Sequence, residues 1–333
     1  MRPGLVLAAG PNGAGKTNLL ESLHVATQGF SPRTRVDANL VRFGASGFQV
    51  RAVGTGERGE LTIDVGLQVG DGKHARLNGA LVPSLERVRE ESATLVFTPD
   101  RLAVVKAGPS VRRAYVDRAL GRLFPARATL AAEYADVLAQ RNAALRRAAA
   151  GLIGEDAVNP WTERLATAGA ELSAARAATI AALEQPFTEH AGALGLANAR
   201  LDYEPSPVTS ELLETRLGRD LERGTTGTGP HLDEVRIGAS GHELRVHGSQ
   251  GEQRVAVLAL LLAEAELLAR SRRVPPLLLL DDVLSELDGD RRAALVERVH
   301  GGGQVLVTAA ARGALPGSAD QVLEVSPGRV EEA

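Results

Sequence analysis

The sequence predicts an α/β fold with a mixed sheet, interrupted by an inserted helical arm. Near the start, a short apolar run leads into a glycine-rich loop, and much later a second apolar run ends in two aspartates. Between them lies a long stretch rich in Ala, Leu and Arg with apolar residues at helical spacing. Because buried parallel strands end on one edge of a sheet, the loop and the two aspartates can share a site.

The glycine-rich loop, residues 10–17, reads G-x-x-x-x-G-K-T, the pattern of a phosphate-binding loop. Glycines let successive backbone N–H groups curl round a triphosphate, Lys16 offers a charge to the β- and γ-phosphates, and Thr17 offers a hydroxyl to Mg²⁺. Residues 5–9 read as a buried strand and residues 17–23 as the start of a helix, whose N-terminus favours an anion. The expected ATP-binding residues are Gly10, Pro11, Asn12, Gly13, Ala14, Gly15, Lys16, Thr17 and Asn18.

Composition excludes several classes of protein. Hydrophobic residues make up 44% of the 333 residues, enough for a substantial core. The absence of cysteine excludes disulfides, thiolate nucleophiles and Cys-based zinc sites, and it is compatible with a cytoplasmic location. No run approaches the ~18 apolar residues of a membrane span, and Val255–Leu268 reads as a buried helix. The apolar N-terminal run leads straight into the loop, unlike a signal peptide.

Charge gives no global signal for a nucleic-acid partner. The net charge is −3 at pH 7, so any contact with DNA must come from local patches. Nearly all the positive charge is arginine, which favours bidentate contacts with phosphate but also arises from codon bias.

The elements between the loop and the arm read as strands. Residues 46–82 alternate apolar and polar positions, with turns expected at 54–56, 70–72 and 78–79, which predicts a small antiparallel sheet. Residues 95–98 predict a further strand.

Helical patterns then cover 110–150 and 161–194, joined by a turn at 151–160. They predict either an antiparallel helical arm or a plain helical subdomain. We divide the chain into an ATPase lobe with the phosphate loop (1–108), the helical insertion (109–220) and a second part of the ATPase lobe (221–333).

The second half of the lobe contains the two aspartates. Residues 277–280 are all leucine and are followed by Asp281 and Asp282, which is the form of a Walker B element. Asp281 would hold Mg²⁺ and Asp282 would orient or deprotonate the attacking water. Residues 304–308 read as another buried strand, and 322–330 as an edge hairpin.

A third element, Ser249-Gln250-Gly251-Glu252-Gln253-Arg254, comes directly before the helix predicted from Val255. Serine and glycine at a helix N-terminus form a second end that can bind an anion. Taken alone the element reads equally well as a helix cap, but it lies one helix upstream of the two aspartates.

This order of motifs resembles the SMC-like branch of the ABC-type ATPases, and within it a family of bacterial recombination mediators. The resemblance covers nearly the whole chain. It is carried by residues 10–21, 97–100, 104–109, 112–113, 117, 229–231, 249–254, 278–288 and 291–292.

The resemblance implies an ATP-dependent homodimer. The signature Ser249, Gln250, Gly251 and Glu252 would touch ATP bound to the other subunit, and Ser285, Glu286, Leu287 and Asp288 would form the loop that crosses the dimer interface. It further implies a slow Mg²⁺-dependent ATPase, used as a switch in DNA repair, replication-fork restart and the SOS response. Partners would be double-stranded DNA at single-strand gaps and mediators of the RecO/RecR type. As DNA contacts we name Arg112, Arg113, Arg146 and Arg147.

Three departures from the family pattern stand out. The strand pair that usually precedes the phosphate loop and helps to hold adenine is missing, so either the start is misassigned or truncated, or adenine is held from elsewhere. Thr308-Ala309 takes the place of a common histidine, so a γ-phosphate contact depends on Thr308 or is absent. Leu232 stands where arginine usually follows Gly-Pro-His.

Three alternatives share some of these motifs. They are the nucleotide-binding subunit of a membrane transporter, a small-molecule kinase, and a clamp that binds ATP and DNA without hydrolysis.

We expect slow hydrolysis, because Asp282 is one methylene shorter than the glutamate common in fast ABC-type sites.

Overall fold

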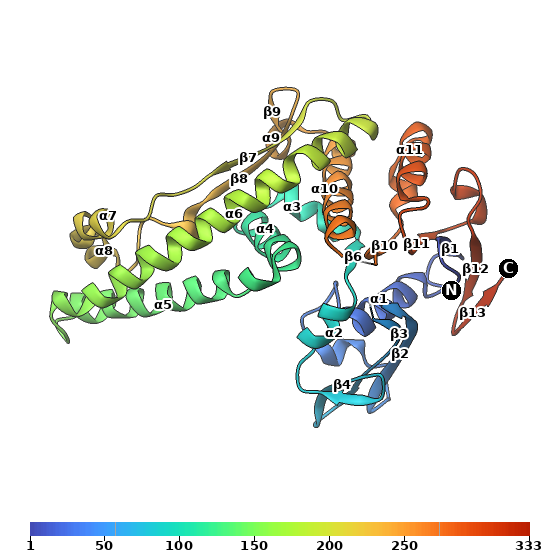
Figure 1. Cartoon of the computed structure of the whole chain (residues 1–333), viewed down its shortest axis with the longest axis horizontal. Coiled ribbons are helices and arrows are strands. Elements are labelled where there is room, and N and C mark those ends of the chain that lie inside the picture. The colour runs from blue at the N-terminus through green and yellow to red at the C-terminus, as the bar shows by residue number, and fades with distance from the viewer. Residues whose placement is uncertain (57, 273) are drawn as a thin grey trace. The chain divides into compact units, whose positions relative to one another are not determined.

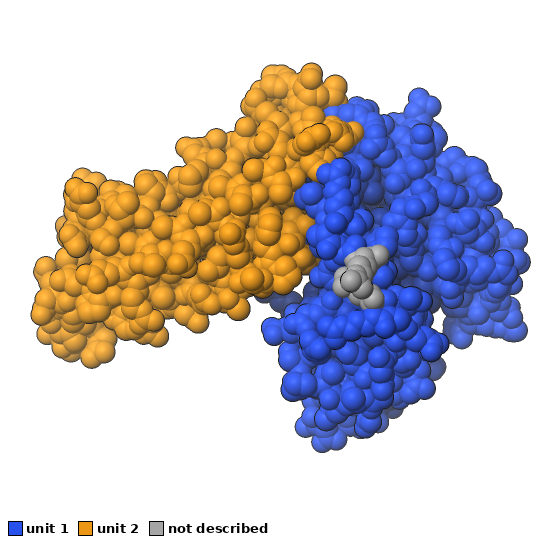
Figure 2. All heavy atoms as spheres, viewed as in Figure 1, with its two compact units in different colours: residues 1–102, 190–196, 250–333 blue, residues 103–189, 197–249 orange. Residues whose placement is uncertain are grey.

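The structure, a computed structural model, describes residues 1–56, 58–272 and 274–333. The chain forms two compact units (Figure 2). Unit 1 contains residues 1–102, 190–196 and 250–333, and unit 2 contains residues 103–189 and 197–249. Within the described ranges, every helix is too short or too polar to cross a membrane.

Unit 1 is built on a mixed sheet, which in the described part of the chain has six strands in the order β13-β12-β1-β11-β10-β6 (Figure 1). All neighbours are parallel except β12 and β13, which form the predicted edge hairpin. The bounds are β1 Leu5–Ala9, β6 Thr94–Phe97, β10 Leu277–Leu280, β11 Val305–Ala309, β12 Gln321–Ser326 and β13 Arg329–Glu332. Every residue of β1, β6 and β11 is buried, as expected of parallel strands covered on both faces.

The helices of unit 1 are α1 Lys16–Gln28, α2 Glu86–Glu91, α10 Gln250–Ser271 and α11 Gly289–Val299. Leu20 of α1 packs with Val6, Leu279 and Leu306 into the core of the main sheet. Helix α10 is buried along most of its length, which confirms the buried helix predicted at 255–268.

A second, antiparallel sheet of unit 1 follows α1, with β2 Gly47–Gly56, β3 Gly59–Gln68, β4 Gly72–Leu77 and β5 Ala80–Val82 in that order. Asn78 and Gly79 both have positive φ and form the expected two-residue turn between β4 and β5. The turn expected at 54–56 is wrong. The pairing of Gly54 with Leu61 continues strand β2 through Gly56, and the connection to β3 includes residue 57, which lies outside the described residues.

Unit 2 contains two long helices, α5 Leu130–Ala149 and α6 Asn159–Ala193, of which the last turn belongs to unit 1. The first predicted helical stretch, 110–150, is divided, because the 3₁₀ turn Pro125–Arg127 separates a shorter helix, Pro109–Leu123, from α5. Leu165 and Leu172 of α6 pack with Tyr134 of α5 in a hydrophobic core cluster of this unit. The other elements are α3 Ala103–Lys106, α4 Pro109–Leu123, α7 Ser210–Thr215, α8 Leu217–Arg223, α9 Leu244–His247, β7 Ala199–Glu204, β8 Glu234–Ala239 and β9 His242–Glu243.

The boundaries of unit 2 differ from the predicted insertion at 109–220. Strand β7 pairs antiparallel with β8, placing Leu201 opposite Ile237, so residues up to 249 belong to the same unit as the helices. Residues 190–196 instead belong to unit 1, where His190 Nε2 lies 2.8 Å from Glu266 Oε2 of α10. The pairing of β7 with β8 is a contact between separate segments, which local composition does not reveal.

Candidate nucleotide site

The phosphate loop lies between β1 and α1 and is shaped by two glycines with positive φ. Gly13 has φ +81° and Gly15 has φ +104°, a region that residues with a Cβ rarely adopt. A Cβ built at either position would meet no atom within 4 Å, so the positive φ, and not crowding, is what favours glycine at both positions. Such a loop at a helix N-terminus presents backbone N–H groups to an anion.

Gly10 is required for a different reason. A Cβ there would lie 2.2 Å from the carbonyl oxygen of Val325 in β12, while its own N–H donates to the carbonyl of Ala309 in β11 at 3.2 Å. The first glycine of the motif is therefore required by the close approach of β12, a reason that the phosphate-loop pattern does not include.

Lys16 begins α1 and is 9% exposed. Its Nζ donates to the carbonyl oxygens of Gly10 at 2.7 Å and Pro11 at 3.1 Å, which places the ammonium inside the loop. Both acceptors are uncharged backbone carbonyls, so neither bond pairs the ammonium with a carboxylate. The charge thus lies where phosphate oxygens would enter.

Thr17 and Asp281 meet across 264 positions of sequence. The Thr17 hydroxyl lies 3.2 and 3.1 Å from the two carboxylate oxygens of Asp281, which is 7% exposed at the end of β10. Mg²⁺ in nucleotide sites takes one or two protein oxygen ligands and completes its octahedron with phosphates and water. A hydroxyl beside a carboxylate fits that ion, so Thr17 and Asp281 are the residues that would hold it.

Asp282 has a left-handed backbone, φ 49° and ψ 26°, and an exposed side chain. It precedes the short 3₁₀ helix η6, Val283–Glu286, and its N–H donates to the hydroxyl of Thr308 at 2.8 Å. Strained backbone of this kind in a residue with a side chain is concentrated at functional sites. The adjacent aspartates thus face different surroundings, one buried by the sheet and one exposed beside the loop.

Thr308 had been considered as a contact for the γ-phosphate. It is 0% exposed, and its hydroxyl donates to Asp281 Oδ1 at 2.8 Å. The structure therefore favours the other expectation, that no phosphate contact arises at this position.

The predicted signature lies at the start of α10. Ser249 and Gln250 are exposed, whereas Gly251 and Glu252 are half-buried. Along the chain, Ser249 is the last residue of unit 2 and Gln250 begins α10 in unit 1. The signature is therefore displayed at a helix N-terminus.

The predicted interface loop is partly exposed and partly structural. Ser285 and Asp288 are exposed, whereas Leu287 is buried. Asp288 caps α11 by accepting the N–H of Arg291 at 2.9 Å. Glu286 forms an ion pair with Arg254, which connects this loop to the signature helix within unit 1.

The four arginines named for DNA divide into two kinds. Arg112 is 2% exposed and donates to the carbonyl of Ala107 and to Glu234, so its guanidinium serves the interior of unit 2. Arg113 is half-buried and donates to the carbonyl of Asp233 at 2.7 Å. Arg146 and Arg147, in the last turn of α5, are exposed. Burial reflects packing against distant strands, which a helical pattern does not reveal.

The Gly229-Pro230-His231 block forms part of a closed polar core in unit 2. His231 Nε2 lies 3.0 Å from the carbonyl oxygen of Thr226 and must donate to it, so Nδ1 accepts from the Tyr134 hydroxyl at 2.7 Å. Burial lowers the pKa of the His231 imidazole and raises that of Tyr134. A Cβ on Gly229 would lie 2.7 Å from that hydroxyl, which explains the glycine. Leu232 is 51% exposed.

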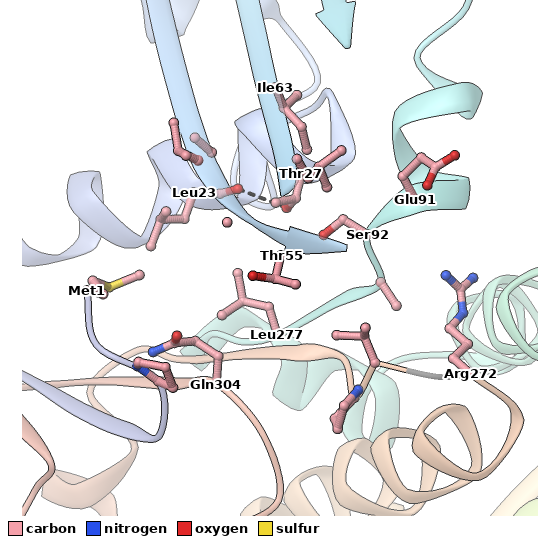
Figure 3. A pocket seen from close by; sticks show the side chains of 18 residues that line it. Met1, Leu23, Thr27, Thr55, Ile63, Glu91, Ser92, Arg272, Leu277 and Gln304 are labelled. Carbon is pink, nitrogen blue, oxygen red and sulfur yellow. Dashed lines mark hydrogen bonds between the residues drawn. The ribbon is translucent and has the colours of Figure 1, made fainter. Parts of the chain in front are cut away.

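Figure 3 shows a cavity of about 390 Å³ at the opposite edge of the main sheet. Leu277 at the start of β10 and Gln304 just before β11 line it, together with Leu23 of α1 and Ile63 of β3. Its described lining residues include none of the phosphate loop. The cavity is therefore a feature of the amino edge and not part of the nucleotide site.

The chain is similar to proteins of known kind. No family model matches it. It is 38% identical over 340 residues to the DNA replication and repair protein RecF of Frankia alni, covering 94% of this chain and 89% of that protein. A solved structure of the recombination mediator protein RecF-ATP in the RecFOR pathway superimposes with a TM-score of 0.85 at 28% identity, covering 100% and 92% of the two chains. The Smc head bound to the C-winged helix domain of ScpA shares the fold, with a TM-score of 0.61 at 17% identity, covering 99% and 90%.

Fold and site together define an SMC-like head of the ABC-type ATPase class, with a helical insertion between the two parts of its ATPase lobe. Within that class, the chain belongs to the RecF family of DNA replication and repair proteins. The relatives therefore do not favour a membrane transporter subunit.

Proposed function

We propose that this chain is a slow Mg²⁺-dependent ATPase that uses ATP as a switch for dimerisation on DNA. The observation that carries the proposal is the contact of Thr17 with Asp281, beside a glycine-rich loop whose carbonyls bind the Lys16 ammonium. Bound Mg²⁺ would neutralise charge on the transferred phosphoryl group. Lys16 and the loop N–H groups bind and orient the triphosphate, and the exposed Asp282 orients water for attack.

Dimerisation follows from the exposed groups of the second half-site. Ser249 and Gln250 at the start of α10, and Ser285 and Asp288 after β10, are exposed. If the γ-phosphate is gripped by Lys16 from one copy and the signature from the other, ATP binds the dimer more tightly. Linkage then requires that ATP favours dimerisation.

The direct test is the molecular mass in solution, with and without ATP and Mg²⁺ and with gapped duplex DNA supplied. We expect a dimer only with ATP, and a monomer under all conditions for Lys16→Met. A wild-type chain that stays monomeric at saturating ATP on gapped duplex would refute the proposed switch.

Asp282→Asn separates the ATPase from a clamp that binds ATP without hydrolysing it. Removing a general base lowers the hydrolysis rate about a hundredfold or more, so the variant should accumulate ATP-bound dimers. Phosphate release and dimer lifetime measure the two effects. An unchanged dimer lifetime would favour the clamp, and many turnovers per second in the wild type would contradict a slow switch.

The DNA role is proposed from the relatives, which are named for DNA replication and repair and for the RecFOR pathway. We propose double-stranded DNA at single-strand gaps as the substrate, with RecO/RecR-type mediators as partners in recombinase loading, fork restart and the SOS response. Because bacterial DNA lies in the cytoplasm, we place the activity there. Arg146 and Arg147 are the exposed members of the arginine set and the preferred phosphate contacts. A gapped duplex that binds no more tightly than an intact duplex would contradict the gap preference.

A further inference from the structure

Thr308 lies near the carboxyl end of β11, between β1 and β10. It pairs with Ala8 of β1, and its predecessor Val307 pairs with Leu280, the last residue of β10. Thr308 is therefore level with Asp281, the first residue beyond β10. At 0% exposure, its hydroxyl lies inside this edge of the sheet and not on its surface.

The hydroxyl contacts both aspartates of the Walker B element. It accepts the backbone N–H of Asp282 at 2.8 Å and donates to Asp281 Oδ1 at 2.8 Å. A hydroxyl has one proton and two lone pairs, so both bonds form at once. The amide can only donate, which leaves the hydroxyl proton for the carboxylate.

These two bonds fix groups that would otherwise move. Two hydroxyl groups from different elements contact the Asp281 carboxylate, those of Thr17 in α1 and Thr308 in β11. The backbone of Asp282 has φ 49°, which persists in a residue with a side chain only when its surroundings enforce it. The bond from its N–H to Thr308 is one such restraint.

We infer that Thr308 is a positioning residue for both Walker B aspartates. Through Asp281 it orients a ligand of the metal, and through the amide of Asp282 it holds the turn that presents the water-orienting side chain. The role rests on the proposed ATPase activity. It differs from contact with the γ-phosphate, because the hydroxyl is buried and both of its bonds go to the aspartates.

Two substitutions separate the hydroxyl from the packing of the side chain. Thr308→Val keeps the shape but leaves the Asp282 N–H without this acceptor and Asp281 without this donor. Thr308→Ser keeps the hydroxyl and removes the methyl group. A role in positioning therefore predicts that serine rescues what valine loses, whereas a role in packing predicts the reverse.

The first measurement is independent of catalysis. A fluorescent ATP analogue is titrated at increasing Mg²⁺ and, separately, in EDTA, and the fold is checked by circular dichroism. We expect Thr308→Val to need roughly tenfold more Mg²⁺ for half-maximal enhancement of binding, with unchanged affinity in EDTA. Thr308→Ser should follow the wild type.

The second measurement is the single-turnover rate at saturating ATP and Mg²⁺, which we expect to fall about tenfold in Thr308→Val and to be retained in Thr308→Ser. Valine behaving as the wild type in both measurements, or serine failing as badly as valine, overturns the inference. If valine does not fold, Thr308→Ala is compared with Thr308→Ser by the same criteria. If the wild type hydrolyses no ATP, the proposed function fails, and the Mg²⁺ titration alone still decides the role of Thr308.

Discussion

The nucleotide edge of unit 1 and the polar core of unit 2 contain the same kinds of residue in opposite arrangements. In unit 1, the Lys16 ammonium donates to two backbone carbonyls of its own loop, and neither bond involves a carboxylate. In unit 2, the fully buried Arg141 donates to Asp220, Thr226 and Thr162. The charge of Arg141 is thus balanced by a carboxylate of its own unit, whereas the two bonds of Lys16 go to uncharged oxygens.

A second ion-pair network of unit 2 is equally closed. Arg176 donates to both carboxylate oxygens of Asp117 and to Asp233 at 2.9 Å, and Asp233 also accepts the hydroxyl of Tyr203 at 2.5 Å. Such networks align helices and strands with each other. The two regions should therefore respond differently to mutation, unit 2 through stability and unit 1 through ligand affinity.

The largest effect is expected from Arg141→Met, which leaves the Asp220 carboxylate buried without its partner. Breaking a buried ion pair on one side costs about 3–5 kcal/mol of unfolding free energy. Urea unfolding of unit 2 measures it. Arg146→Met on the same helix is the matched control, since an exposed arginine should change stability by less than about 0.5 kcal/mol. Equal costs for the two variants would contradict the closed network.

Lys16→Met should have the next largest effect and act on affinity alone. Losing a charged donor to phosphate costs about 2–3 kcal/mol, roughly a hundredfold in the dissociation constant of ATP. Unfolding without nucleotide should stay unchanged. Lys106→Met, which removes an exposed lysine of α3, is the control and should bind ATP normally. A stability loss without an affinity loss in Lys16→Met would reverse the comparison.

The exposed arginines of unit 2 provide a smaller effect. If Arg146 and Arg147 each contact one phosphate, replacing both by glutamine should weaken the salt dependence of binding. The negative slope of log affinity against log salt should become smaller in magnitude by about 2. Arg200 and Arg236 are also exposed, but they pair with Asp202 and Glu204. Their double glutamine variant removes the same charge and should leave the slope unchanged. Binding of gapped duplex over a salt series measures both.

The smallest effect is a pH dependence of stability from His231. Burial lowers its pKa in the folded state, with a further lowering by Arg113, while Thr226, Asp233 and Asp220 act the other way. The unfolded chain therefore takes up a proton near pH about 6.5 before the folded chain does. The contribution of His231 to the free energy of unfolding is therefore fully present above that pH and is lost as the pH falls. His231→Gln keeps a donor and an acceptor without titrating, so its melting temperature should fall less than that of the wild type between pH about 7.5 and about 5.5.

Prediction from sequence succeeded where the signal is local. The runs at 5–9 and 277–280 are apolar throughout and form the parallel strands β1 and β10, and the run at 304–308, with three apolar residues between Gln304 and Thr308, contains most of β11. It failed for the turn at 54–56, because glycine marks permissive backbone and the pairing with β3 decided where the strand ends. The burial of Arg112 depends on Glu234 of β8, more than a hundred residues away, and the boundary of unit 2 depends on the pairing of β7 with β8.

The sequence by itself determined the chemistry of this protein: a loop that can curve round phosphate, a lysine and a hydroxyl at its end, and two aspartates after a buried strand. These follow from residue types at fixed spacing, which govern local backbone and charge. Only the tertiary structure decided which groups meet, namely Thr17 with Asp281, Thr308 with both aspartates, and Gly10 with the carbonyl of Val325. Such contacts depend on the order and register of strands in the sheet, which are set by the packing of the whole unit.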